Sequence, residues 1–296
     1  MSSVSQSEIA EAADQSSGIS RCAVGVIGSG TMGTQISEYL LQLGYPVILK
    51  TRCSENVEGI ITKLEKKLSK GLRDQEVRQC LERLTVTTLY SDLNDVDIVI
   101  EASVEDSDVK RKVFSDLSAV CKPATIFATN SSSLSIDRLA DSTGRPDRFV
   151  GLHMFNPLRR MNLIEVITGT NTSAATRDFT VSFAQDLKKQ PILVKNCPGF
   201  IVNRLLLPQI NEAIRLLGDR IASLEDIDVA VKLGLNHPMG PFELADFIGL
   251  DTCLSILNTL QADLEDSCYK PAPLLQTMVD QGKLGYKSGE GFYRYR

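Results

Sequence analysis

Two residues stand out because their types fit poorly with their apolar surroundings. His153 is one of only two histidines, and it ends the apolar run 149–152. Glu165 lies inside the apolar run 163–167, where an unpaired carboxylate would be costly. A histidine can take the proton of a hydroxyl group, and a carboxylate can orient its ring and stabilise its charged form. From the residues alone, a catalytic pair and a structural buried pair explain this pattern equally well.

A glycine-rich loop follows the first apolar strand of the chain. The run 24–27 leads into Gly28-Ser29-Gly30-Thr31-Met32-Gly33 and then into a helical pattern. The first glycine permits a tight turn, the second lets a pyrophosphate approach the backbone, and the third lets the helix pack closely on the strand. Free N–H groups at the start of the helix would face the anion. We therefore predict a dinucleotide site at this loop, and a glycine-rich turn without a ligand is the alternative.

The end of the second strand bears on which dinucleotide is bound. Folds that bind NAD place an Asp or Glu there to hold the ribose 2′-OH. Here the strand ends in Lys50-Thr51-Arg52, and the first acid is Glu55. A hydroxyl and a guanidinium group would bind a 2′-phosphate, so we expect NADP to be preferred over NAD, with Thr51 and Arg52 as contacts. The alternative is that Lys50 and Arg52 only solvate the strand end.

The composition excludes several classes of protein. The 296 residues are 43% hydrophobic and 23% charged, with a formal net charge of −5, which is typical of a globular protein and unsuited to nucleic-acid binding. No apolar stretch is long enough to cross a membrane. The seven cysteines are scattered and never spaced as C-x-x-C, which indicates reduced thiols. Residues 1–20 lack the features of a secretory or mitochondrial leader, so we expect a flexible tail and a cytoplasmic protein.

The hydrophobic pattern changes its period once along the chain. Residues 21–197 alternate short β-branched runs with amphipathic segments, which predicts a Rossmann-type, doubly wound, mostly parallel sheet with helices on both faces. Residues 198–296 show only helical patterns and predict an all-helical C-terminal domain. The expected strands are 22–28, 46–50, 84–88, 97–102, 125–129, 149–153, 163–168 and 191–195. An extra helical pair is expected at 55–84, and the C-terminal helical stretches are 200–217, 223–234, 242–264 and 272–282.

Several long motifs carry a family resemblance. They are GSGTMG, VIEASVED, ATNSSSLSI, GLHMFNP, LIEVITG, NCPGFIVNR, LNHPMGPFELADFIGLD and LGYKSGEGFY. In this order they make the chain, from residue 21 to its end, resemble the 3-hydroxyacyl-CoA dehydrogenase family, including its 3-hydroxybutyryl-CoA dehydrogenase members.

The resemblance implies a role for each matching residue of the reaction site. His153 would be the general base and Glu165 its orienting partner. Ser132 would hydrogen-bond the reacting 3-oxygen, and Asn203 would reach the same site from the helical domain. Each of the last two residues has a structural alternative, since Ser132 could start the helix that follows it and Asn203 could cap or pair within its own helix.

The resemblance also implies contacts with the cofactor and with the CoA moiety. Asn130 and Asn156 match positions near the nicotinamide, while Glu105 and Lys110 match other cofactor contacts. Lys63 lies on a lysine-rich helical segment that flanks the CoA moiety in the family. A solvated face is the alternative for Lys110 and for the lysine-rich segment.

The implied activity is the reversible oxidation of a (3S)-3-hydroxyacyl-CoA of short chain, such as 3-hydroxybutyryl-CoA, to the 3-oxoacyl-CoA. The alternatives are a dehydrogenase acting on a carrier-protein-bound hydroxyacyl group or on a free hydroxy or sugar acid, and a non-catalytic nucleotide-binding protein. The family also implies a homodimer through the helical domain. Arg159 and Arg160 depart from the family pattern, and they would either contact an anionic group or be solvated.

Overall fold

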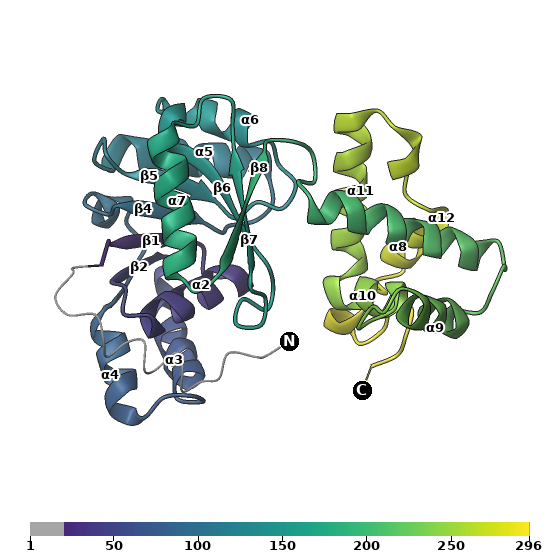
Figure 1. Ribbon diagram of the computed structural model, residues 1–296. Coiled ribbons are helices and arrows are strands. Elements are labelled where there is room, and N and C mark those ends of the chain that lie inside the picture. The colour runs from purple at the N-terminus through teal and green to yellow at the C-terminus, as the bar shows by residue number, and fades with distance from the viewer. Residues whose placement is uncertain (1–20, 296) are drawn as a thin grey trace. The chain divides into compact units, whose positions relative to one another are not determined.

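Eight short strands form one sheet in the order β3-β2-β1-β4-β5-β6-β7-β8 in the computed structural model, which describes residues 21–295 (Figure 1). The strands are β1 (Val24–Ile27), β2 (Val47–Lys50), β3 (Leu84–Thr87), β4 (Ile98–Glu101), β5 (Ile126–Thr129), β6 (Phe149–Met154), β7 (Leu163–Thr168) and β8 (Gln190–Lys195). All neighbouring strands are parallel except β6 and β7, which pair antiparallel. The expected fold class, a mostly parallel Rossmann-type sheet followed by a helical domain, is confirmed. The predicted tail 1–20 lies outside the described residues.

Alternate residues of the strands supply the cores on the two faces of the sheet. The helices that accompany the sheet are α2 (Thr31–Gln42), α3 (Val57–Leu68), α4 (Asp74–Glu82), α5 (Ser107–Val120), α6 (Ile136–Ala140) and α7 (Ala174–Asp186). On one face, Val24 and Val26 join a core with Ile36 and Leu40 of α2. On the other face, Phe114 of α5 packs edge-on against a β6 phenylalanine, with ring centroids 4.7 Å apart. Burial on both faces explains why the central strands β1, β4, β5 and β6 are largely apolar.

The second unit is built from helices around a separate apolar core. Its helices are α8 (Val202–Gly218), α9 (Leu224–Gly234), α10 (Pro241–Ile248), α11 (Leu250–Leu264) and α12 (Pro273–Asp280). The stretch 242–264, expected as one helical segment, is two helices because Gly249 between them has a φ of +103° that a regular helix does not allow. Ser223 caps α9 by accepting a hydrogen bond from the Asp226 N–H at 3.1 Å, as the sequence predicted.

Residues 132–134 group with the helical unit, although they lie inside the sequence of the sheet unit. Among the described residues, the first compact unit comprises 21–131 together with 135–196, and the second comprises 132–134 together with 197–295. The chain therefore passes between the two units three times. Across 21–295, no helix is both long and apolar enough to cross a membrane.

A buried carboxylate holds the C-terminal segment on the helical unit. Asp246 of α10 is 1% exposed, and it accepts hydrogen bonds from the backbone N–H groups of Phe292 and Tyr293, both at 2.9 Å. The Tyr295 hydroxyl donates to the same carboxylate at 2.8 Å. A Cβ at Gly291 would lie 2.0 Å from this carboxylate, so the closing motif needs glycine there.

Candidate active site

The loop between β1 and α2 has the geometry of a dinucleotide phosphate site. Gly28 has a φ of +103°, and a Cβ at Gly33 would lie 1.8 Å from the Gly28 carbonyl oxygen, so both positions require glycine. A Cβ at Gly30 would meet no atom within 4 Å, which leaves its exposed backbone open to a ligand. Thr31 and Met32 begin α2, and no side chain caps this helix. The loop thus fits a pyrophosphate group, whose charge the uncapped helix N-terminus favours.

Two hydroxyl groups meet at the end of β2, where an acid would select NAD. Ser29 Oγ and Thr51 Oγ1 are 3.0 Å apart, and Thr51 is 2% exposed. Arg52 beside them is exposed. The ammonium group of Lys50 lies 4.0 Å from the centroid of the Tyr90 ring, so this lysine is stacked on an aromatic side chain instead of extending freely into solvent.

Antiparallel pairing brings the predicted His–Glu pair together. In the β6–β7 register, His153 lies directly opposite Glu165, and its Nδ1 is 2.7 Å from Glu165 Oε2. The two residues are 6% and 1% exposed, and the Phe155 ring lies 4.4 Å from the imidazole, centroid to centroid. A buried carboxylate in an apolar strand is therefore paired. The pair stands near the carboxyl end of β6, the end of a strand at which α/β sheets bind their ligands.

Two asparagines on neighbouring strand ends are held by specific hydrogen bonds. Asn130 follows β5, and its Oδ1 accepts from the Met154 N–H at 2.9 Å. Asn156 follows β6, and its Oδ1 accepts from Gln35 Nε2 of α2 at 2.9 Å. Both asparagines belong to the sheet unit and lie beyond the carboxyl ends of their strands.

A buried ion pair stands at the end of β4, and it includes a residue that the sequence interpretation overlooked. Lys110, which is 1% exposed, donates to both carboxylate oxygens of Glu101 at 2.8 Å. Its ammonium group also lies 3.3 Å from Glu105, which in turn accepts from the Ser131 hydroxyl at 2.6 Å. The Thr129 hydroxyl donates to Glu101 at 2.7 Å. Lys110 is thus not on a solvated face. The signal for Glu101 was present, because it is a carboxylate that ends an apolar strand.

Ser132 and Asn203 are joined within the second unit. Asn203, 8% exposed in the first turn of α8, donates through Nδ2 to the Ser132 carbonyl oxygen at 3.0 Å. Ser132 does not cap the following helix. Ser135 does so, with its hydroxyl oxygen accepting from the Arg138 N–H. The structural alternative for Ser132 as a helix cap is therefore wrong.

The loop after β6 is anchored by charged side chains. Both Arg159 and Arg160 are exposed, and Arg159 pairs with Glu38 of α2 at 2.8 Å. Lys189 donates to the Leu158 carbonyl oxygen at 2.7 Å and to a second carbonyl group of the same loop. Burial lowers the pKa of Lys189 to about 8. Neither anchor could be predicted from the sequence, because each joins residues far apart in the chain.

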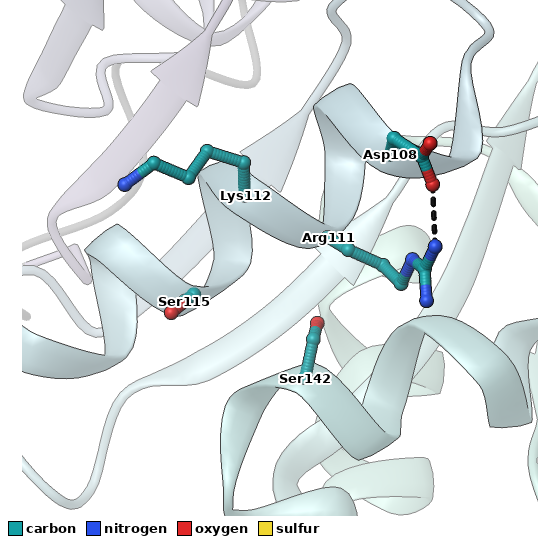
Figure 2. A pocket seen from close by; sticks show the side chains of 5 residues that line it. All are labelled: Asp108, Arg111, Lys112, Ser115 and Ser142. Atoms are coloured by element: carbon teal, nitrogen blue, oxygen red, sulfur yellow. Dashed lines mark hydrogen bonds and ion pairs between the residues drawn. The ribbon is translucent and has the colours of Figure 1, made fainter.

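Lys63 is a surface residue of the sheet unit. It is exposed on α3, whose buried residues are apolar and whose outer face is rich in lysine. Figure 2 shows a shallow hollow elsewhere, along α5. Its lining residues are Asp108, Arg111, Lys112, Ser115 and Ser142. In this hollow Arg111 is paired with Asp108, and none of the predicted site residues lines it.

Comparisons with known proteins agree with this arrangement. The 3-hydroxyacyl-CoA dehydrogenase NAD binding domain matches residues 23–197, and the C-terminal domain of the same family matches residues 199–295. The chain belongs to the 3-hydroxyacyl-CoA dehydrogenase family. The family resemblance seen in the sequence is thus confirmed, as is a nicotinamide cofactor as the class of dinucleotide.

Several members of this family are similar over almost their whole length. A 3-hydroxybutyryl-CoA dehydrogenase of Clostridioides difficile is 46% identical over 275 residues, which cover 91% of this chain and 98% of that protein. The crystal structure of FadB2 from M. tuberculosis has a TM-score of 0.90 and 38% identity, covering 94% of this chain and 100% of the other. The (S)-3-hydroxybutyryl-CoA dehydrogenase PaaH1 from Ralstonia eutropha has a TM-score of 0.88 and 41% identity, covering 93% and 99%.

Removing one partner of the buried Glu101–Lys110 ion pair should destabilise the protein, and removing both should restore most of the stability. Glu101→Gln should lower the free energy of unfolding by about 3 kcal/mol, because it leaves the Lys110 charge buried with only Glu105 beside it. The double variant Glu101→Gln, Lys110→Met should regain most of that loss, since no buried charge is stranded. Urea unfolding at pH 7 measures both. A single variant within about 0.5 kcal/mol of the wild type would contradict the assignment.

Proposed function

We propose that this family member oxidises a short-chain (3S)-3-hydroxyacyl-CoA, such as 3-hydroxybutyryl-CoA, to the 3-oxoacyl-CoA, reversibly. The observation that carries the proposal is the buried His153–Glu165 pair, 2.7 Å apart, in the same sheet unit as the phosphate loop. Burying this pair costs free energy that an apolar pair of similar volume would not, which supports a catalytic role over a purely structural one. The relatives' names supply the substrate class.

In this mechanism Glu165 determines which ring nitrogen of His153 takes the proton. Its carboxylate binds Nδ1, so Nε2 is the nitrogen that takes the proton of the 3-hydroxyl group. As the proton moves to Nε2, the C3–H bond breaks and the C3–O bond becomes a carbonyl double bond. The charge that forms on the imidazole is stabilised by Glu165. A bound nicotinamide supplies the acceptor for the hydride that leaves C3.

The remaining predicted residues take binding and orienting roles in this proposal. Ser132 hydrogen-bonds the 3-oxygen through its side chain, and Asn203 fixes the Ser132 backbone through the 3.0 Å bond to its carbonyl group. Glu105 contacts the cofactor with support from Lys110. Lys63 attracts a CoA phosphate in this proposal, and its exposure on a lysine-rich helix supports that role. A cytoplasmic location also stays a prediction.

The catalytic proposal is tested with acetoacetyl-CoA reduction and 3-hydroxybutyryl-CoA oxidation. His153→Asn should lower kcat by about a thousandfold and Glu165→Gln by about a hundredfold, because the first removes the base and the second only its orienting charge. Dinucleotide binding should persist in both variants, which serves as the control for folding. Wild-type protein that binds a dinucleotide but turns over neither thioester would contradict the substrate class and favour a carrier-bound or free hydroxy acid.

We further propose that NADP is preferred over NAD. Thr51 stands where an acid would repel a 2′-phosphate, its hydroxyl contacts that of Ser29, and the exposed Arg52 guanidinium is next in the chain. Wild-type kcat/KM should therefore be higher with NADPH than with NADH. The double variant Thr51→Asp, Arg52→Ile should reverse that order, since a carboxylate accepts from the ribose 2′-OH and repels a phosphate. A wild type faster with NADH would contradict this proposal and leave the reaction itself in place.

A homodimer through the helical unit is proposed from its exposed apolar side chains. Leu205 of α8 is 72% exposed, and Val229 and Leu233 of α9 are 46% and 81% exposed. Covering them with a second copy would remove this apolar surface from water. Leu233→Lys should shift the mass measured by light scattering towards the monomer at micromolar concentration. Leu89→Lys, at a 59% exposed position of the sheet unit, is the matched control and should leave the mass unchanged.

A further inference from the structure

Helix α2 holds the loop that follows β6 at two points, one helical turn apart. Gln35 bonds Asn156 and the Leu158 backbone, both at 2.9 Å. Three residues later in the helix, Glu38 pairs with Arg159 at 2.8 Å. Since α2 begins at the phosphate loop, the same helix contacts both the phosphate site and the loop beyond His153. Only the Gln35 contact involves a predicted cofactor-binding residue, Asn156.

The direction of the Asn156 amide follows from a backbone group. The Leu158 N–H can only donate, so it fixes Oε1 of Gln35 as the acceptor. The other end of the Gln35 amide is then the donor, Nε2, and it bonds Oδ1 of Asn156. Nδ2 of Asn156 therefore faces away from α2. Within 21–295, this amino group has no hydrogen-bond partner among the protein atoms, and Asn156 is exposed.

Asn130 shows the same arrangement on the adjacent strand end. Its Oδ1 is occupied by the Met154 N–H, which again can only donate. Both asparagines therefore keep their amino groups for other partners, at the ends of the neighbouring strands β5 and β6. Two donors prepared in this way suit oxygen acceptors such as the carboxamide oxygen or phosphate oxygens of a nicotinamide dinucleotide.

We propose that Gln35 is a positioning residue for the cofactor, acting through Asn156. Gln35 does not need to touch the ligand. It keeps the Asn156 amide from reversing, so that a donor and not an acceptor meets the oxygen atoms of the dinucleotide. An asparagine on an exposed loop would otherwise sample both amide orientations. The inference rests on the proposed dinucleotide site. It assigns a role to Gln35, which lies outside the glycine-rich motif 28–33.

The variant Gln35→Glu tests this role while preserving the loop anchor. A carboxylate still accepts from the Leu158 N–H, but it presents an acceptor to Asn156, which must reverse its amide to bond it. The dissociation constant for NADPH or NADH should then rise about tenfold, because one hydrogen bond is lost and two acceptors face each other. Isothermal titration calorimetry measures this without any acyl substrate.

Arg159→Met is the matched control, because it releases the other anchor of the same loop and leaves the Asn156 amide in place. Its dissociation constant should stay within about twofold of the wild-type value. A purely structural role for Gln35 would instead make the two variants alike in binding and in melting temperature.

A double variant tests whether Gln35 acts through Asn156. In an Asn156→Ala background, Gln35→Glu should cause no further weakening, since the group through which it acts is gone. Weakening that persists in that background, or a Gln35→Glu variant that binds like the wild type, would overturn the proposal. Because binding is measured without a thioester, a failure of the proposed acyl-CoA activity would be seen separately, in the turnover assays.

Discussion

The geometry of the His153–Glu165 pair depends on the reversed direction of β7 and β8 relative to the other six strands. Every other neighbouring pair of strands is parallel, but β7 runs against β6, and this register sets Glu165 directly opposite His153. Residues opposite one another in an antiparallel pair have their Cβ atoms only about 5 Å apart, so the register itself sets the spacing of the pair. A shift of one residue would turn the carboxylate to the other face of the sheet. The eight-stranded order thus supplies the geometry on which the proposed proton transfer depends.

Around that pair, the strand ends are held by hydrogen bonds whose direction is fixed. The Glu101 carboxylate accepts from a hydroxyl group and from the Lys110 ammonium, and both charges are almost completely buried. Loops at the carboxyl ends of strands lack the regular bonds of a sheet, so their order depends on such side-chain contacts. The Lys189 amine serves the same purpose beneath the loop after β6, at the cost of burying a charge. The site combines a rigid sheet with individually anchored loops.

Local hydrophobic patterns predicted the strands and the fold class, but they could not predict contacts between residues far apart in the chain. All eight strands formed where the apolar runs indicated. The strands β1, β4, β5 and β6 are buried throughout and therefore largely apolar, whereas β8 is mostly exposed. Glu165 was identified because it is a charged residue in an apolar strand. The same reasoning applied to Glu101, which ends the apolar strand β4, would have identified the second buried carboxylate. Gln35 gave no such signal, because a glutamine on a helix is unremarkable until the loop it bonds is known. The break at Gly249 was missed because the apolar pattern continues across it.

The grouping of residues 132–134 with the helical unit limits how the two units can be separated. Ser132 is encoded within the sheet unit, yet its carbonyl group is bonded by Asn203 of the helical unit. A gene fragment cut at the end of β8 would therefore yield a helical piece without its serine and a sheet piece with that serine detached from its partner. Neither fragment would keep the hydrogen bond between Asn203 and Ser132. Exchange of domains between relatives would therefore have to carry the segment 132–134 with the helical unit to preserve this contact.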